Sequence, residues 1–231
     1  MKKMQLFLLH FAGGNCYSFQ FLQPYLSEVT FTPLELPGRG KRYGESLLWD
    51  IDEATADIIQ QINEKLVSEN YVIYGHSLGA LLTLKAAAMM EKNKRPAQHL
   101  VVSGNAGPDM RVKRQRHLMT RGPLKEELKR LGGVPEEFLV NEELFDFYEP
   151  ILRADFALAE QDSVDSYEQV NTPLHAIMGE GEEDSKYIGN WAAFTESFTG
   201  ATLLPGGHFF IHDYPREVAG IIKQCCRIQA F

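Results

Sequence analysis

Cysteine is scarce in this chain of 231 residues, and apolar residues never form a run long enough to cross a bilayer. Cys225 and Cys226 are neighbours and Cys16 lies far from both, which argues against a disulfide framework and favours a reducing compartment. A membrane-spanning helix needs about 20 apolar residues. In the N-terminal stretch MKKMQLFLLHF the apolar run ends after about seven residues. No small-residue cleavage site of a signal peptide follows it. We therefore expect a soluble, cytoplasmic protein without a membrane partner.

The sequence also lacks internal repeats, low-complexity tracts and long Gly/Ser/Pro linkers. We therefore expect residues 1–231 to form a single domain. Basic residues do not outnumber acidic ones either: the net charge is −8, which disfavours nucleic acid as a partner. Residues 111–130 are the exception. This basic segment contains eight basic and two acidic residues, which gives it a local charge of +6.

What is present is an alternation of strand-like and helix-like segments. The expected strands cover residues 4–9, 29–36, 71–74, 99–103, 173–179 and 201–204. Helical patterns lie between them, including 52–66 with Asp52 as a candidate N-cap. This order predicts an α/β fold, with a mostly parallel sheet covered by helices on both faces. Residues 107–169 carry helical patterns but no clear strand, and they predict a helical insertion over one end of the sheet.

The motif GHSLG at residues 75–79 lies between an expected strand and an expected helix. Gly-x-Ser-x-Gly in this setting is typical of a sharp turn that lifts a serine hydroxyl above the carboxyl edge of the sheet. The glycines let the backbone pass without a Cβ clash, and the helix N-terminus favours a developing negative charge. Ser77 is therefore the candidate nucleophile.

A serine nucleophile needs a base, and seven histidines are available. His208 in LLPGGHFF follows a strand and two glycines late in the chain, which predicts a loop at the same sheet edge. We favour His208, and His212, four residues on, is its rival.

The third member should be a carboxylate after the fifth strand, where IMGEGEEDS offers several. The usual spacing, three residues past the glycine, selects Glu182, which would orient the imidazole and balance its charge. Asp184 is the alternative if the turn differs slightly, and Asp155, from the insertion, is a third candidate.

Two backbone N–H groups are needed to bind the oxyanion of a tetrahedral intermediate. The residue after the nucleophile, Leu78, supplies one. The turn HFAGG after the first strand should supply the other, and Ala12 is the expected donor.

With these residues placed, the chain resembles the type II thioesterases of polyketide and non-ribosomal peptide synthesis, in the α/β-hydrolase superfamily. FAGGN resembles the oxyanion loop of that family, LPGRGKRYGE its Pro-Gly-Arg-Gly-x-Arg signature, GHSLGALL its elbow and LPGGHFFI its histidine loop. Residues 131–160 resemble its helical lid, so the resemblance covers nearly the whole chain. One departure is Glu182, where the family usually has Asp. The family also carries an Asp at the position of Asp155.

The resemblance implies an α/β-hydrolase fold and hydrolysis of acyl thioesters from the phosphopantetheine arm of a carrier protein. Ser77 would form an acyl intermediate that His208 helps water to cleave. No metal or other cofactor is implied. We expect one face of the apolar segment 142–159 to line an acyl pocket.

The expected partner is an acyl or peptidyl carrier protein, and we expect the enzyme to be a monomer. Because carrier proteins are typically acidic, the basic segment is a candidate docking surface. The residues of this hypothesis are Arg111, Lys113, Arg114 and Arg116. The alternative functions are a carboxylesterase or lipase-like hydrolase of free esters, an acyltransferase, and a non-catalytic binding module.

Overall fold

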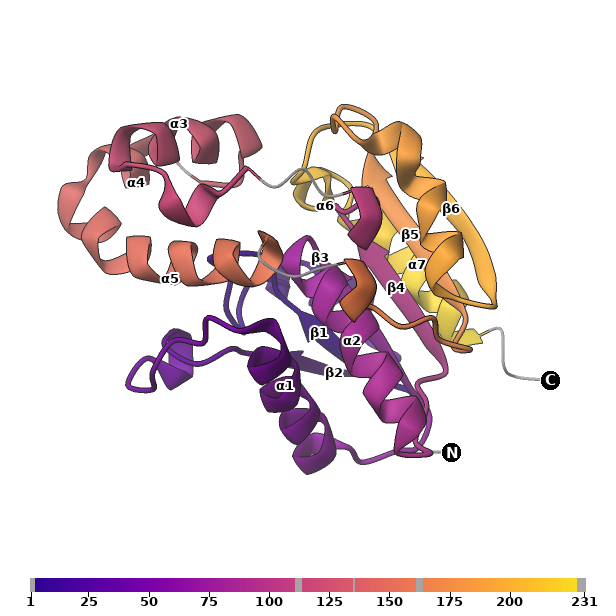
Figure 1. Ribbon diagram of the computed structural model, residues 1–231. Coiled ribbons are helices and arrows are strands. Elements are labelled where there is room, and N and C mark those ends of the chain that lie inside the picture. The colour runs from indigo at the N-terminus through magenta and orange to yellow at the C-terminus, as the bar shows by residue number, and fades with distance from the viewer. Residues whose placement is uncertain (1–2, 111–113, 135, 161–163, 228–231) are drawn as a thin grey trace.

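Six parallel strands form one sheet in the order β2-β1-β3-β4-β5-β6, in a computed structural model that describes residues 3–110, 114–134, 136–160 and 164–227 (Figure 1). All the pairings between neighbouring strands are parallel. The strands are β1 (Gln5–Leu9), β2 (Thr30–Leu34), β3 (Tyr71–His76), β4 (His99–Ser103), β5 (Leu174–Gly179) and β6 (Phe198–Leu204). Each lies within a few residues of a strand predicted from the sequence.

Helices connect the strands and cover both faces of the sheet. The α-helices are α1 (Ile51–Lys65), α2 (Leu78–Lys92), α3 (Arg121–Leu131), α4 (Glu136–Val140), α5 (Glu142–Glu160), α6 (Phe210–Asp213) and α7 (Pro215–Arg227). Short 3₁₀ helices cover Gln20–Tyr25, Gly40–Arg42, Pro108–Met110, Arg116–Leu118, Val164–Ser166 and Ser185–Phe194. None of the helices within the described ranges is both long and apolar enough to cross a bilayer.

The predicted cap of α1 was wrong by two residues. Asp50, not Asp52, has extended backbone angles, and its carboxylate accepts hydrogen bonds from the N–H groups of Asp52 and Glu53. An N-cap carboxylate needs this non-helical conformation to reach the N–H groups of the first turn. Asp52 already lies inside that turn, where its backbone is helical.

Two apolar cores lie on opposite faces of the sheet. One packs α1 and α2 against strand residues such as Phe7 and Ile73. The other packs α7 and the 3₁₀ helix Gln20–Tyr25 against Leu8 and Tyr74. Because alternate residues of one strand face opposite cores, both kinds must be apolar, which explains the continuous apolar runs of the sequence. The predicted α/β architecture with helices on both faces is confirmed.

Between β4 and β5 lie α3, α4 and α5, which Figure 1 shows beyond one end of the sheet. They share a small apolar cluster that includes Leu128, Phe145, Leu152 and Phe156. Leu158, near the end of α5, belongs instead to the core beneath the sheet, so α5 joins the two. The helices lie inside the predicted insertion at 107–169. Their action as a lid, and the single domain, stay predictions.

The strand order places a topological switch between β1 and β3. The connection from β1 leads to β2 on one side, whereas the chain after β3 continues through β4, β5 and β6 on the other. Loops therefore diverge at the carboxyl ends of β1 and β3, and open α/β sheets bind ligands at such a point.

Gly79 allows α2 to lie against the end of β1 at this switch point. A Cβ at Gly79 would lie 2.0 Å from the carbonyl oxygen of Leu9. Neither group can move without shifting the strand or the helix. Strand β1 and the first turn of α2 can therefore approach this closely only if residue 79 is glycine.

Gly79→Ala should lower the free energy of unfolding by about 2–4 kcal/mol, because the methyl group would force backbone apart. Gly220→Ala in α7 is the matched control, since nothing lies within 4 Å of its added Cβ. It should raise stability by up to about 1 kcal/mol through helix propensity. Urea unfolding of the two variants measures both changes, and equal stabilities would contradict the close approach.

Candidate active site

Ser77 occupies a strained turn between β3 and α2. Its backbone angles are φ 57° and ψ −112°, a region that non-glycine residues rarely adopt. Its N–H donates to the carbonyl of Ser103 at 2.8 Å, which ties the turn to the neighbouring strand. A Cβ at Gly75 would lie 2.1 Å from the carbonyl oxygen of Gly79. Both glycines of the motif are therefore required by close backbone contacts, one within the turn and one to β1.

His208 and Glu182 approach Ser77 from the loops after β6 and β5. The Nε2 atom of His208 lies 3.1 Å from the Oγ atom of Ser77, and its Nδ1 atom lies 2.6 Å from Oε2 of Glu182. The second carboxylate oxygen, Oε1, accepts the N–H of Gly179 at 2.8 Å. Glu182 is thus held at the end of β5 by one oxygen while the other faces the imidazole. The structure brings these three predicted residues together in one chain of hydrogen bonds.

The other predicted acids have different surroundings. Asp184 is the residue before the 3₁₀ helix Ser185–Phe194, and its backbone carbonyl accepts the N–H of Tyr187. Asp155, fully buried in α5, pairs with Arg39 through both oxygens, at 2.5 and 2.8 Å. Neither is the carboxylate bonded to Nδ1 of His208.

His212, the rival base, lies in α6 among aromatic rings. Its ring stacks on Phe209 with centroids 5.9 Å apart, and lies 4.5 Å from the ring of Phe21. Burial lowers its pKa. The imidazole bonded to Ser77 is that of His208.

Sequence reasoning missed a contribution from His76, the residue before the serine. Its ring lies beside that of His208, with centroids 5.1 Å apart and the two planes tilted by 40°. Its Nδ1 atom bonds to the hydroxyl of Ser103 at 2.8 Å, which in turn bonds to the hydroxyl of Tyr74. Burial, followed by the nearby His208 and His212, lowers the pKa of His76 well below its usual value. The imidazole next to His208 is therefore held in its neutral form.

The predicted oxyanion donors lie on either side of the switch point. Leu78 is the first residue of α2, and the N–H groups of a first helical turn have no partner within the helix. Ala12 lies in the loop after β1. Both residues line a cavity beside the hydroxyl of Ser77.

Two cavities meet at Ser77. One, of about 250 Å³, is mostly apolar and extends beneath α3 and α5, lined by side chains such as Leu128, Tyr148, Leu152 and Phe156. The expected apolar lining from segment 142–159 is therefore present. The other, of about 260 Å³, is more polar and is bordered by Arg114, Arg116, Arg130 and Asn105.

The basic segment is neutralised more fully than its sequence suggested. All six of its described basic residues form ion pairs with acidic side chains. Arg116, for example, bonds to Glu160 and, at 2.8 Å, to Glu127, and is mostly buried. Arg114, more exposed, pairs with Glu183. Arg111 and Lys113 lie outside the described residues.

Within the described ranges, no cluster of three or more His, Cys, Asp or Glu side chains could hold a metal ion. Chemistry without a metal or another cofactor stays a prediction.

This geometry accompanies clear similarity to known proteins. The profile of the thioesterase domain family matches residues 4–226, so the chain belongs to that family, and the protein is a thioesterase. The gramicidin S biosynthesis protein GrsT of Aneurinibacillus migulanus is 28% identical over 221 residues, covering 94% of this chain and 86% of GrsT. The α/β-hydrolase fold and the resemblance to type II thioesterases seen in the sequence are confirmed.

Solved structures give the same result. RedJ, a thioesterase from the prodiginine pathway of Streptomyces coelicolor, superposes with a TM-score of 0.86 at 27% identity, covering 97% of this chain and 86% of RedJ. BorB, a type II thioesterase from the borrelidin biosynthetic cluster, gives 0.84 at 27% identity, covering 97% and 93%.

Stability should fall as the pH drops from 7 to 4, because the fold buries neutral histidine. Burial lowers the pKa of His10 to about 4, whereas an unfolded imidazole titrates near 6.5. At pH 5 the unfolded chain binds a proton that the folded chain does not, and this favours unfolding. His10 alone should cost about 2 kcal/mol between pH 7.5 and 5.0.

The measurement is urea unfolding of the wild type and of His10→Asn at both pH values. The variant should lose about 2 kcal/mol less than the wild type over this interval. Equal losses would show that His10 does not stay neutral in the folded protein.

Proposed function

We propose that this thioesterase hydrolyses acyl groups from the phosphopantetheine arm of a carrier protein, through an acyl intermediate on Ser77. The observation that carries the proposal is the hydrogen-bond chain from Ser77 through His208 to Glu182. A nucleophile bonded to a base, with the base oriented by a third group, is the arrangement that acyl transfer to serine requires.

In the first half of the reaction, the Oγ atom of Ser77 attacks the thioester carbonyl while Nε2 of His208 takes its proton. Glu182 keeps the other ring nitrogen protonated and stabilises the imidazolium. The C–S bond then breaks and the thiol leaves with the proton from His208. A thiol has a pKa near 8.5, so its departure needs little acid assistance.

In the second half, water replaces the thiol. His208 removes a proton from the water as it attacks the acyl-serine, and then returns a proton to Ser77 as the carboxylic acid leaves. The N–H groups of Ala12 and Leu78 bind the oxyanion in both halves.

The two cavities suit the two parts of such a substrate. The apolar cavity beneath α3 and α5 fits an acyl chain, because its aliphatic and aromatic lining favours apolar surface. The polar cavity fits the phosphopantetheine arm, whose amides and phosphate can bond to its arginines and asparagine.

The class of partner rests on the relatives. GrsT, RedJ and BorB come from biosynthetic pathways for gramicidin S, prodiginine and borrelidin. We infer that this chain likewise serves a polyketide or non-ribosomal peptide synthase and clears acyl groups from its carriers. Docking of the carrier near Arg114, the monomeric state and a cytoplasmic location stay predictions.

Mass spectrometry of a carrier protein loaded with several acyl groups tests the function. The wild type should restore the free thiol of the arm, and Ser77→Ala should slow this by at least about 10³-fold. Ser77 should also react with a fluorophosphonate, whereas the variant should not. Cleavage of simple esters but not of the carrier thioester would favour an esterase. Acyl transfer to an added alcohol or amine in preference to water would favour an acyltransferase.

A matched pair of variants tests the identity of the acid. Glu182→Gln should lower kcat by about 10²–10⁴-fold, because an amide cannot balance the imidazolium charge. Asp184→Asn should change kcat less than about threefold, since Glu182 is the carboxylate bonded to His208. Steady-state rates on a small acyl thioester give both values, and the reverse order would assign the acid to Asp184.

A further inference from the structure

The conformation of the loop after β1 depends on one carbonyl group, that of Phe11. It accepts a hydrogen bond from the ring Nδ1 of His10 at 2.8 Å and from the N–H of Gly14 at 2.9 Å. Two donors on one carbonyl fix the direction of the peptide that links Phe11 to Ala12.

That direction decides where the N–H of Ala12 points. In a trans peptide the C=O and N–H bonds of one plane point in opposite directions, and the described chain has no cis peptide. With the carbonyl of Phe11 directed at His10 and Gly14, the N–H of Ala12 is directed the other way. Ala12 lines both cavities beside Ser77 and His208.

The tautomer of His10 follows from its second nitrogen. Nε2 lies 3.3 Å from the N–H of Leu36, which can only donate, so Nε2 accepts and Nδ1 carries the hydrogen. The ring is 3% exposed, and burial together with the positive charge of Arg39 keeps it neutral. His10 therefore serves as a fixed, uncharged donor that bridges the loops after β1 and β2.

The next peptide of the loop is fixed from the opposite side. The N–H of Gly13 donates to Oδ2 of Asp155 at 2.7 Å, and Asp155 is held in turn by Arg39. The N–H of Gly13 is thus engaged, which leaves that of Ala12 as the donor directed at the cavity.

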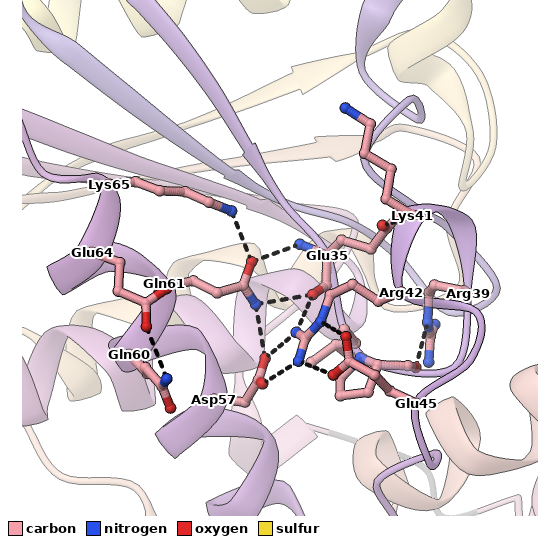
Figure 2. Close-up of polar contacts among 12 residues, drawn as sticks. Glu35, Arg39, Lys41, Arg42, Glu45, Asp57, Gln60, Gln61, Glu64 and Lys65 are labelled. Atoms are coloured by element: carbon pink, nitrogen blue, oxygen red, sulfur yellow. Dashed lines mark hydrogen bonds and ion pairs between the residues drawn. The ribbon is translucent and has the colours of Figure 1, made fainter.

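Arg39 lies in the loop after β2, which many hydrogen bonds hold in place. Figure 2 shows Arg42 of this loop paired with Asp57 of α1, and the amide of Gln61 of the same helix donating to the backbone carbonyl of Glu35. The carboxylate of Glu35 accepts the N–H of Cys16 at 2.9 Å and that of Lys41 at 2.8 Å. The loops after β1 and β2 therefore hold one another in place.

We propose that His10 is a positioning residue of this thioesterase, which aims the N–H of Ala12 at the oxyanion by holding the carbonyl of Phe11. The inference rests on the proposed acyl-serine mechanism. His10 does not touch the substrate, and its effect passes through one peptide plane.

Two substitutions of His10 separate its two nitrogens. In His10→Asn the amide nitrogen lies near the position of Nδ1 and can still donate to Phe11, but nothing replaces Nε2. In His10→Gln the amide reaches the position of Nε2, and the donor to Phe11 is lost. We expect His10→Gln to lower kcat on a small free acyl thioester at least tenfold more than His10→Asn, with KM changed less than about threefold, because oxyanion stabilisation acts in the transition state.

Inhibition by a trifluoromethyl ketone analogue of the thioester distinguishes this role from a purely structural one, because the inhibition constant would not change if His10 only stabilised the fold. It forms an anionic adduct with serine, so its inhibition constant should rise in parallel with the loss of kcat/KM in His10→Gln. The dissociation constant of the corresponding unreactive thioether should stay within about threefold. Equal losses of kcat in both variants, or unchanged inhibition by the ketone in His10→Gln, would overturn the proposal.

Nitrogen-15 spectra of the wild type, with histidine labelled, keep the proposal testable even if a variant does not fold. His10 should show the tautomer with hydrogen on Nδ1 at pH 7, and hydrogen on Nε2 would overturn the inference. None of these tests uses a carrier substrate, so a failure of the wild type on carrier substrates would count against the proposed partner and not against His10.

Discussion

Backbone contacts too close for a side chain determine where Ser77 lies. Gly75 meets the backbone of Gly79, and Gly79 meets that of Leu9, so β1, the turn and α2 pack without any Cβ between them. The strained angles of Ser77 persist because this packing leaves the turn no alternative. The direction of the hydroxyl, and hence the whole site, follows from three segments of backbone in contact.

The parallel sheet then brings distant residues to the same place. The loops after β1, β3, β5 and β6 all leave the sheet at one edge, so Ala12, Ser77, Glu182 and His208 meet although they span most of the sequence. Two of these residues are anchored at a strand end: the carboxylate of Glu182 accepts the N–H of the last residue of β5, and the N–H of Ser77 donates to the carbonyl of the last residue of β4. Such anchoring lowers the entropy lost when the reacting groups align.

The sequence predicted the six strands, the serine turn and the imidazole, because glycine spacing and apolar runs report local backbone requirements. It left the acid open, since four carboxylates share one turn and only the fold decides that Glu182 faces His208. It also overstated the basic patch, because the acidic partners of Arg116 and Arg121 lie up to 44 residues away along the chain. The role of His10 depends on a single carbonyl, and no residue pattern encodes that.

Helix α5 contains Pro150, which cannot donate the backbone hydrogen bond of its position. Beyond the proline, Asp155 and Leu158 fasten the helix to the loop after β1 and to the core. Before it, Phe145 and Tyr148 pack in the apolar cluster of α3, α4 and α5, to which Leu152 and Phe156 also belong. The helix therefore lacks one backbone hydrogen bond in the turn before Asp155, the residue that holds the loop after β1, so its course there depends on side-chain packing.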